Sequence, residues 1–152
     1  MPGSGKSTIG KILSAKTGKR FIDIDREVES LEQINIPKIF RAYGERHFRN
    51  LESEIINEVC KETGQIIATG GGAVLRPENI STMKKNGIIV WIKRDIDKLS
   101  IRDRPLSKDV DSLKKMFAER KDIYERNCDI TIKNDQILSA ANEAIGKIEG
   151  LQ

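Results

Sequence analysis

The sequence predicts an α/β fold with a mostly parallel β-sheet, on three observations. Short apolar segments alternate with longer amphipathic segments along the chain. The apolar segments are nearly continuous in Ile and Val, which is typical of strands buried on both faces. A glycine-rich run at the N-terminus leads directly into the first amphipathic segment. Together these features favour parallel strands joined by helices that pack on the sheet.

The elements follow from the apolar periodicity, the glycines and the prolines. In the first half, Gly18 is a plausible helix stop, Pro37 fits a helix start, and Gly44 interrupts a long helical stretch. The predicted helices cover residues 7–18, most of 26–64, 78–87, 95–103, about 113–126 and 135–150. Within the second of these, a longer amphipathic part runs from about 45 to 62. The predicted strands cover residues 19–25, 65–72 (with three glycines at its end), 88–93 and 129–132.

Length and composition fit one domain over residues 1–152. With 38% hydrophobic and 33% charged residues, the chain can bury a single substantial core. The net charge of +4 suits a protein that handles a small anion, and it is too weak and scattered to predict a nucleic-acid surface. No apolar run approaches the roughly 18 residues of a membrane span. We therefore expect no nucleic-acid or membrane partner.

The two cysteines indicate a reducing compartment and do not form a metal-binding or redox motif. Cys60 and Cys128 are far apart and form no CxxC pair, so neither a metal motif nor a redox motif is indicated. Isolated thiols fit a reducing environment. No leader-like segment precedes the glycine-rich run, and the sequence therefore predicts a cytoplasmic protein.

The N-terminal run predicts a phosphate-binding loop. The pattern G-x-x-x-x-G-K-[ST] is complete except for its first glycine, which would fall one place before Met1. Backbone N–H groups of such a loop converge on phosphates, and the helix that follows adds the positive end of its dipole. Lys6 would reach the β- and γ-phosphates, and the Ser7 hydroxyl would bind Mg²⁺. The alternative is a glycine turn before a capped helix. The expected ATP-binding residues here are Gly3, Ser4, Gly5, Lys6, Ser7 and Thr8.

Asp23 and Asp25 flank Ile24 at the end of the second predicted element. On a strand, period-2 geometry turns both carboxylates to the same side. Ligands of open α/β sheets bind outside the carboxyl ends of the strands, where these two acids would project. One could hold Mg²⁺ through its water shell and the other could take a proton from a substrate hydroxyl. The alternative is a helix N-cap with a solvated acid beside it.

Two further segments are candidates for a ligand site. Arg49 and Glu52 stand three residues apart on one helix face, which by itself is more typical of an ordinary surface ion pair. The three glycines of residues 70–72 would permit close approach of the backbone to a ligand, with a β-bulge as the structural alternative. Arg102 and Arg104 lie in a polar segment between helices, and Arg120 lies on the next helix. Arginines delivered by such elements can neutralise charge on a transferred phosphoryl group.

Taken together, these residues resemble one family. "GSGKST", "DID", "FRNLE", "TGGGAV", "RPL" and "ERKDIY" follow one another in the order and spacing of shikimate kinases, from Gly3 to about Tyr124. The resemblance implies a three-layer P-loop NTPase fold of the nucleoside-monophosphate-kinase type, with a substrate-binding helical region (about 25–52) and a mobile lid (about 102–112). It also implies an ATP-dependent kinase that requires Mg²⁺ and phosphorylates the 3-hydroxyl of shikimate in aromatic amino acid biosynthesis. We expect the protein to be a monomer.

The resemblance also implies residue roles. The phosphate clamp would be Lys6, and the metal would be held by Ser7 and, through water, by Asp23. The substrate hydroxyls would be bound by Asp25, the possible base. The substrate carboxylate would be bound by Arg49, Arg120, Gly71 and Gly72, with Glu52 orienting Arg49. The lid arginine at the ATP phosphates would be Arg104, with Arg102 near the adenine. Lys6, Asp25 and Arg120 would be the catalytic residues.

Two features depart from the family pattern. Only Asp103 separates Arg102 from Arg104, where the family usually has several residues more. The strand that feeds the phosphate-binding loop, which the resemblance places mid-sheet, has no counterpart in the sequence. We therefore expect Met1 to be an internal methionine, a strand ending in Gly to belong upstream, and a structure of this chain to show a gap or a substitute strand beside the loop.

Two alternatives to this function stay open. The first is another small-molecule kinase of the same superfamily, acting on gluconate or a nucleotide. The arginine pair and the triple glycine argue against it, because they match the capture of a carboxylate. The second is a catalytically impaired nucleotide-binding fragment. That idea predicts a lost lysine, acid or substrate arginine, and the sequence retains all of them.

Overall fold

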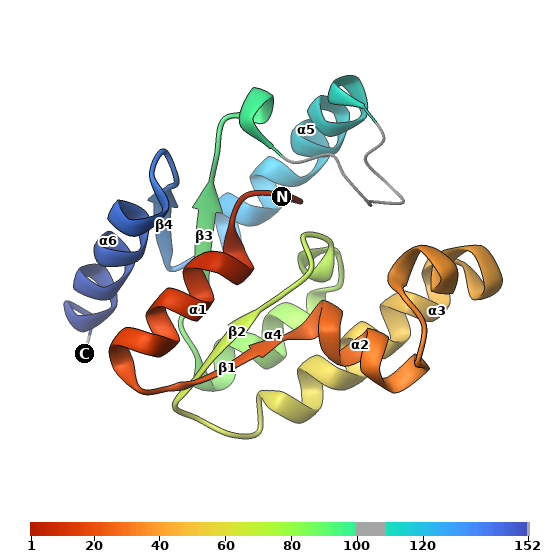
Figure 1. Ribbon diagram of the computed structural model, residues 1–152, viewed down its shortest axis with the longest axis horizontal. Helices are drawn as coiled ribbons and strands as arrows, with labels where there is room; N and C mark the ends of the chain where they lie inside the picture. The colour runs from red at the N-terminus through yellow and green to blue at the C-terminus, as the bar shows by residue number, and fades with distance from the viewer. Residues whose placement is uncertain (100–108, 152) are drawn as a thin grey trace.

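The computed structural model describes residues 1–99 and 109–151 as an α/β arrangement in which helices enclose short parallel strands (Figure 1). The strands are β1 (Arg20–Asp23), β2 (Gln65–Ala68), β3 (Val90–Lys93) and β4 (Ile130–Lys133). The α-helices are α1 (Lys6–Thr17), α2 (Ile24–Glu32), α3 (Ile36–Val59), α4 (Pro77–Asn86), α5 (Val110–Asn127) and α6 (Ile137–Glu149). Two single 3₁₀ turns, η1 (Ala73–Leu75) and η2 (Ile96–Lys98), follow β2 and β3.

The predicted alternation is confirmed, with shifted boundaries. Pro37 lies in the first turn of α3, where the Asn35 carboxamide accepts a hydrogen bond from the Lys38 N–H at 3.0 Å. Gly44 has φ of 80° and ψ of 170°, so α3 kinks there as predicted. The predicted helix over 95–103 is confirmed only as η2 in the described part, and the strand predicted over 88–93 begins at Val90.

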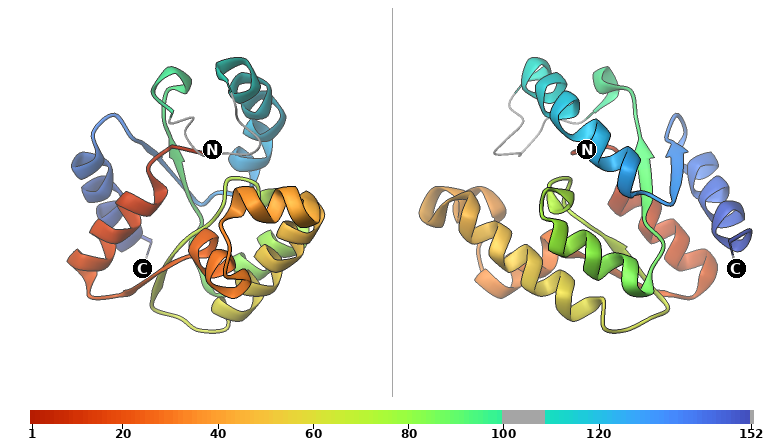
Figure 2. Two further views of the ribbon diagram at one scale, coloured as in Figure 1. Left: turned by 45° about the vertical axis from the view of Figure 1, so that its right-hand side comes forward. Right: turned by 180° about the vertical axis from the view of Figure 1, so that it is seen from behind.

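Three clusters of buried side chains form the core. The pair α1 and α6 packs on one side, with Ile9 and Leu13 of α1 against Ile132 of β4 and the alanines of α6. On the other side, α2, α3 and α4 pack against β1 and β2 around Ile24, Val28 and Ile39. Figure 2 shows these two groups of helices on opposite sides of the strands. A third cluster joins α5 to β3 and contains Met1, Trp91 and Tyr124.

Within the described residues, the strands form two separate parallel pairs rather than one sheet. β1 pairs with β2 from Arg20↔Gln65 to Asp23↔Ala68, and β3 pairs with β4 from Val90↔Ile130 to Lys93↔Lys133. No pairing joins β2 to β3 in this part of the chain. The mostly parallel strands and the expected gap are both confirmed in this part of the chain.

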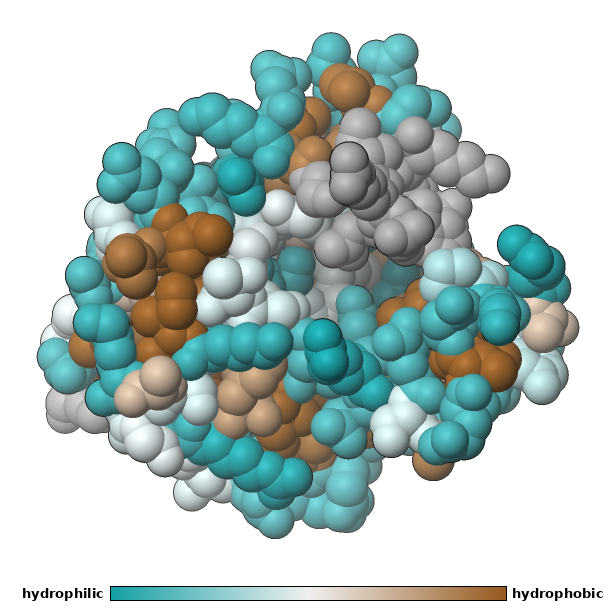
Figure 3. Space-filling view, in the orientation of Figure 1, coloured by the Kyte–Doolittle hydropathy of each residue, from teal (hydrophilic) through white to brown (hydrophobic). Residues whose placement is uncertain are grey.

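The gap is a cavity of about 710 Å³ between the two pairs. Its walls include Ile66 and Ala68 of β2, Val90 and Ile92 of β3, and Leu13 of α1. Apolar side chains reach the surface beside α1 in the space-filling view (Figure 3). Both bordering strands present backbone edges to the cavity, and their apolar side chains line it. These are the hydrogen-bonding groups and the walls that a buried parallel strand requires.

The described helices include none that is both long enough and apolar enough to cross a membrane.

Candidate active site

The phosphate-binding loop opens α1, as predicted. Gly5 precedes the helix in the left-handed conformation, with φ of 96°, and Ser4 is fully buried. The Lys6 ammonium folds back over the loop, where Nζ donates to the Met1 carbonyl at 2.7 Å and lies 3.4 Å from the Ser4 hydroxyl. Ser7 and Thr8 are exposed in the first turn. N–H groups in the first turn of a helix have no acceptor within the helix, and together with the nearby ammonium they suit a bound phosphate.

Asn134 fixes this loop from the sheet, a contact that the sequence analysis missed. The residue follows β4 and is 1% exposed. Its side-chain Nδ2 donates to the Ser4 carbonyl at 2.8 Å, while its backbone N–H donates to the Lys93 carbonyl at 2.7 Å. The available signal was its place after a strand, since the carboxyl ends of parallel strands carry ligand sites. Asn134 therefore couples the end of β4 to the phosphate-binding loop.

Replacing Asn134 by Asp is expected to raise the KM for ATP about tenfold and to leave the KM for the phosphate acceptor within about twofold. The carboxylate would face the Ser4 carbonyl without a donor and would add negative charge beside the phosphates, a loss of roughly 1–3 kcal/mol. Steady-state kinetics with each substrate varied checks this. Asp135→Asn is the control, because Asp135 is the exposed neighbour. Equal rises in both KM values would contradict a role specific to the loop.

The predicted geometry of the acidic pair is wrong in one respect. β1 ends at Asp23, and Asp25 lies in the first turn of α2, so the two carboxylates do not share one face of a strand. The cause is Ile24, which is fully buried and begins the helix. Asp23 stands at the N-cap position without a capping hydrogen bond from its side chain. Both acids still lie at the carboxyl end of β1, beside the start of a helix.

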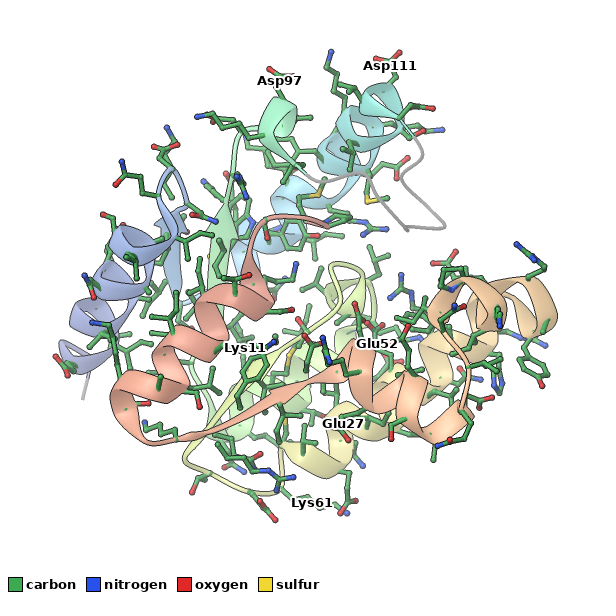
Figure 4. The ribbon with its side chains drawn as sticks, viewed as in Figure 1. Lys11, Glu27, Glu52, Lys61, Asp97 and Asp111 are labelled. Atoms are coloured by element: carbon green, nitrogen blue, oxygen red, sulfur yellow. The ribbon has the colours of Figure 1, made fainter. Side chains whose placement is uncertain are left out.

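Glu52 is fully buried and its partner Arg49 is 11% exposed, so their interpretation as an ordinary surface ion pair is wrong. Nη1 of Arg49 donates to Oε2 of Glu52 at 2.6 Å, and the Glu52 side chain is fully buried. On its exposed side Arg49 also bonds Glu45, with Nε 3.3 Å from Oε1. Figure 4 shows Glu52 in the interior of the molecule, reaching from α3 toward the beginning of α2. A guanidinium held in this way has a fixed orientation.

The triple glycine packs directly on that pair. A Cβ on Gly72 would overlap the Arg49 guanidinium, and a Cβ on Gly70 would overlap Oε1 of Glu52 and lie 3.0 Å from Oδ1 of Asp25. The segment lies between β2 and η1, so the β-bulge alternative is not observed. The absence of side chains at these positions thus brings the backbone against Arg49, Glu52 and Asp25, and it places the three residues around one loop.

Burial controls the protonation of Glu52. Desolvation raises the pKa of its carboxyl above the ordinary value of 4.5, with Asp25 adding to the rise and Arg49 opposing it. The folded state then binds the Glu52 proton more tightly than the unfolded state does. Its contribution to stability is therefore present below about pH 4.5 and is lost as the pH rises through the folded pKa.

As the pH rises from about 4 to 7, the free energy of unfolding of the wild type is expected to fall relative to that of Glu52→Gln. Denaturant titrations of both proteins at several pH values check this sign. Glu45→Gln removes the exposed partner of Arg49 and serves as the control. If the wild type instead becomes more stable relative to Glu52→Gln as the pH rises, the attraction of Arg49 for the Glu52 carboxylate outweighs the desolvation of that carboxylate.

Arg120 completes the cationic side of the site. It lies on α5, is 7% exposed, and contacts Tyr124 one helical turn further along. Arg49 is also near enough to Tyr124 to lower the pKa of its hydroxyl against the effect of burial. The structure therefore brings Arg49, Arg120, Asp25 and the glycine segment around one region. The predicted roles of Arg102 and Arg104, and most of the predicted lid, lie outside the described residues.

The region around Arg49, Arg120 and residues 70–72, called the anion pocket below, adjoins the phosphate-binding loop. A Cβ on Gly71 would lie 3.2 Å from the Met1 carbonyl carbon, and the Tyr124 hydroxyl lies 3.9 Å from the Met1 sulfur. A phosphate-binding loop, acids at the end of the next strand, and a cationic pocket beside both define the class of protein: a P-loop kinase.

Comparison with known proteins gives the family. The family model described as "SKI: Shikimate kinase" matches residues 2–149. A shikimate kinase of Sulfurihydrogenibium sp. is 40% identical over 140 residues, covering 88% of this chain and 84% of that protein. The structure of the Acinetobacter baumannii shikimate kinase in complex with shikimate superposes with a TM-score of 0.93 at 30% identity, covering 99% of this chain and 90% of that one. The crystal structure of the Aquifex aeolicus shikimate kinase superposes with a TM-score of 0.85 at 34% identity, covering 97% of this chain and 92% of that one. The chain belongs to the shikimate kinase family.

Proposed function

We propose that the protein transfers the γ-phosphate of ATP to the 3-hydroxyl of shikimate, giving shikimate 3-phosphate and ADP. The observation that carries the proposal is the buried Arg49–Glu52 pair, packed under the glycine segment and next to the phosphate-binding loop. A fixed guanidinium is suited to a carboxylate, and an adjacent acid is suited to a hydroxyl. Shikimate carries both groups on one ring.

Binding of the acceptor is assigned to the residues around the glycine segment. Arg49 and Arg120 bind the carboxylate, assisted by backbone N–H groups of Gly71 and Gly72. Glu52 holds Arg49 in place through the 2.6 Å contact. Asp25, in the first turn of α2, accepts hydrogen bonds from the ring hydroxyls. This arrangement fixes the acceptor at both ends, which presents one hydroxyl to the phosphate-binding loop.

The transfer step is assigned to Asp25, Lys6 and Arg120. Asp25 takes the proton of the 3-hydroxyl as its oxygen forms the new bond to the γ-phosphorus. The bond from that phosphorus to the bridging oxygen of ADP breaks, and ADP leaves with the electron pair. Lys6 leaves the Met1 carbonyl to contact the β- and γ-phosphates, and Arg120 stabilises negative charge near the acceptor. The contacts of Arg102 and Arg104 with ATP are proposed from sequence alone.

Mg²⁺ is the metal that the residues present would hold. The Ser7 hydroxyl and the Asp23 carboxylate are oxygen donors, and Asp23 is not engaged in capping α2. Two protein oxygens suit Mg²⁺, which usually keeps several waters and binds phosphates directly. When bound, the ion neutralises charge on the phosphates. We further propose a monomer acting in the cytoplasm, where Cys60 and Cys128 stay reduced, as they are in this structure.

A coupled assay of ADP release tests the proposed function. Shikimate, quinate, gluconate and nucleoside monophosphates are offered as acceptors, each with and without Mg²⁺. We expect turnover with shikimate that depends on Mg²⁺. Preference for gluconate or a nucleotide would favour the alternative of another small-molecule kinase, and ATP binding without turnover of any acceptor would favour an impaired nucleotide-binding protein.

A further inference from the structure

Tyr124 joins two parts of the anion pocket and has no assigned role in the reaction described above. Its hydroxyl donates to the Gly71 carbonyl at 2.5 Å. Its ring stacks on Trp91 of β3, with centroids 5.4 Å apart and planes 28° apart. The residue is 6% exposed. Tyr124 is therefore held from the sheet side by stacking while its hydroxyl reaches the glycine segment.

The surroundings of the hydroxyl are those of the proposed carboxylate site. Arg120 lies one turn earlier on the same face of α5, close enough for its charge to act on the Tyr124 hydroxyl. Arg49 and Glu52 are close enough to influence it from α3. Burial raises the pKa of the phenol above its ordinary value of 10.0, so the hydroxyl keeps its proton, and its capacity to donate, at neutral pH.

The glycine segment needs such a constraint. Residues 70–72 carry no side chains to restrict their torsions, and a run of glycines loses more conformational freedom on ordering than other sequences do. The bond from Tyr124 fixes the plane of the Gly71–Gly72 peptide, because carbonyl and N–H share one rigid unit. The same side chain touches Arg120. One residue thus sets the relative position of the backbone donors and a guanidinium.

We propose that Tyr124 is a positioning residue for the acceptor carboxylate, acting by holding the Gly71–Gly72 peptide and the Arg120 guanidinium in the arrangement that binds it. The inference rests on the proposed function in one respect, since it takes the ligand of this pocket to be a carboxylate. Tyr124 also contacts the Met1 sulfur at 3.9 Å, but the backbone of the phosphate-binding loop is held by Lys6 and Asn134. We therefore expect loss of the Tyr124 hydroxyl to weaken binding of the acceptor more than binding of the nucleotide.

Tyr124→Phe tests the proposal because it keeps the ring on Trp91 and removes only the hydroxyl. We expect the KM for shikimate to rise about tenfold, with the KM for ATP within twofold and kcat within about threefold. Glu125→Gln, at the exposed neighbouring position on α5, is the matched control and should match the wild type. Equal rises in both KM values, or unchanged kinetics, would overturn the proposal.

A binding measurement separates this inference from the proposed function. Trp91 is the only tryptophan and stacks on Tyr124, so its fluorescence reports occupation of the pocket without turnover. Titration with shikimate should give a Kd about tenfold higher for Tyr124→Phe. A wild type that does not bind shikimate would contradict the proposed function instead. In that case the same titration with quinate, another hydroxylated carboxylate, tests the role of Tyr124. Equal affinity of the wild type and Tyr124→Phe for quinate would contradict the positioning role.

Discussion

Replacing Asp25 by Asn is expected to lower kcat about 10²- to 10⁴-fold, the range typical of a lost general base, while ATP still binds. Asparagine has nearly the same shape as aspartate but cannot accept the proton of the acceptor hydroxyl. The position in the first turn of α2 places Oδ1 beside the glycine segment, where the acceptor is proposed to bind. Steady-state ADP release, together with a nucleotide-binding titration, measures both quantities.

Glu27→Gln provides the control for this substitution. Glu27 lies in the same turn of α2, and in Figure 4 it points away from Glu52. The variant removes one carboxylate from the same helix end, so it reproduces any loss of helix-dipole stabilisation. It should retain nearly full turnover. Near-normal turnover of Asp25→Asn would remove Asp25 from the proton-transfer step.

Adding an apolar strand before Met1 is expected to have the second large effect, a rise in both stability and activity. In the described part of the chain, no strand pairs with the edges of β2 and β3 that face the cavity, and the strand residues that line it are mainly apolar. Met1 packs with Trp91 of β3 and lies beside Gly71, which follows β2, so the chain enters the loop at the carboxyl end of this cavity. A parallel strand through the cavity would therefore end at the phosphate-binding loop.

The size of that effect follows from burial. Each buried Val or Ile contributes about 1.5–3 kcal/mol, against roughly 1–2 kcal/mol per residue for backbone ordering, and the added hydrogen bonds leave a net gain of a few kcal/mol. For a chain of this size, we expect the Tm to rise by about 10 °C. The test adds about eight apolar residues and a Gly before Met1, a usual strand length. A polar extension of equal length is the control.

Turnover of the extended protein is measured beside its melting curve. A fixed strand would hold the first turn of the loop, so kcat/KM for ATP should increase. If the 152-residue chain already unfolds cooperatively at the same temperature and turns over at the same rate, the cavity does not require a strand.

The order of elements and the location of the site could be predicted from the sequence, because both depend on local patterns. Apolar periodicity, Gly44 and the proline at the start of α3 have the structural effects expected of them. The glycine-rich run opens a helix, as it does wherever backbone N–H groups must converge on a phosphate. The gap expected beside the loop is observed between β2 and β3 in the described residues.

What sequence could not supply were the contacts that depend on burial in three dimensions. Spacing placed Arg49 and Glu52 on one helix face, but only the packing of the glycine segment shows that the pair is buried. A buried Ile24 is compatible with a strand or with a helix, so the sequence did not show that β1 ends at Asp23. That boundary depends on the packing of Ile24 against residues of α3. The contacts of Asn134 and Tyr124 span 130 and 53 residues, a distance that periodicity does not reach.

The central claim is that the pocket around Arg49, Arg120 and the glycine segment selects its acceptor by a carboxylate. The most direct measurement compares kcat/KM for shikimate with that for its methyl ester, which keeps every ring hydroxyl and lacks the charge, and identifies the phosphorylated product by mass spectrometry. We predict phosphorylation of shikimate and a loss of at least about 100-fold for the ester, as expected when charge-assisted hydrogen bonds are removed. Equal turnover of the two, or turnover only of acceptors without a carboxylate, would contradict the claim.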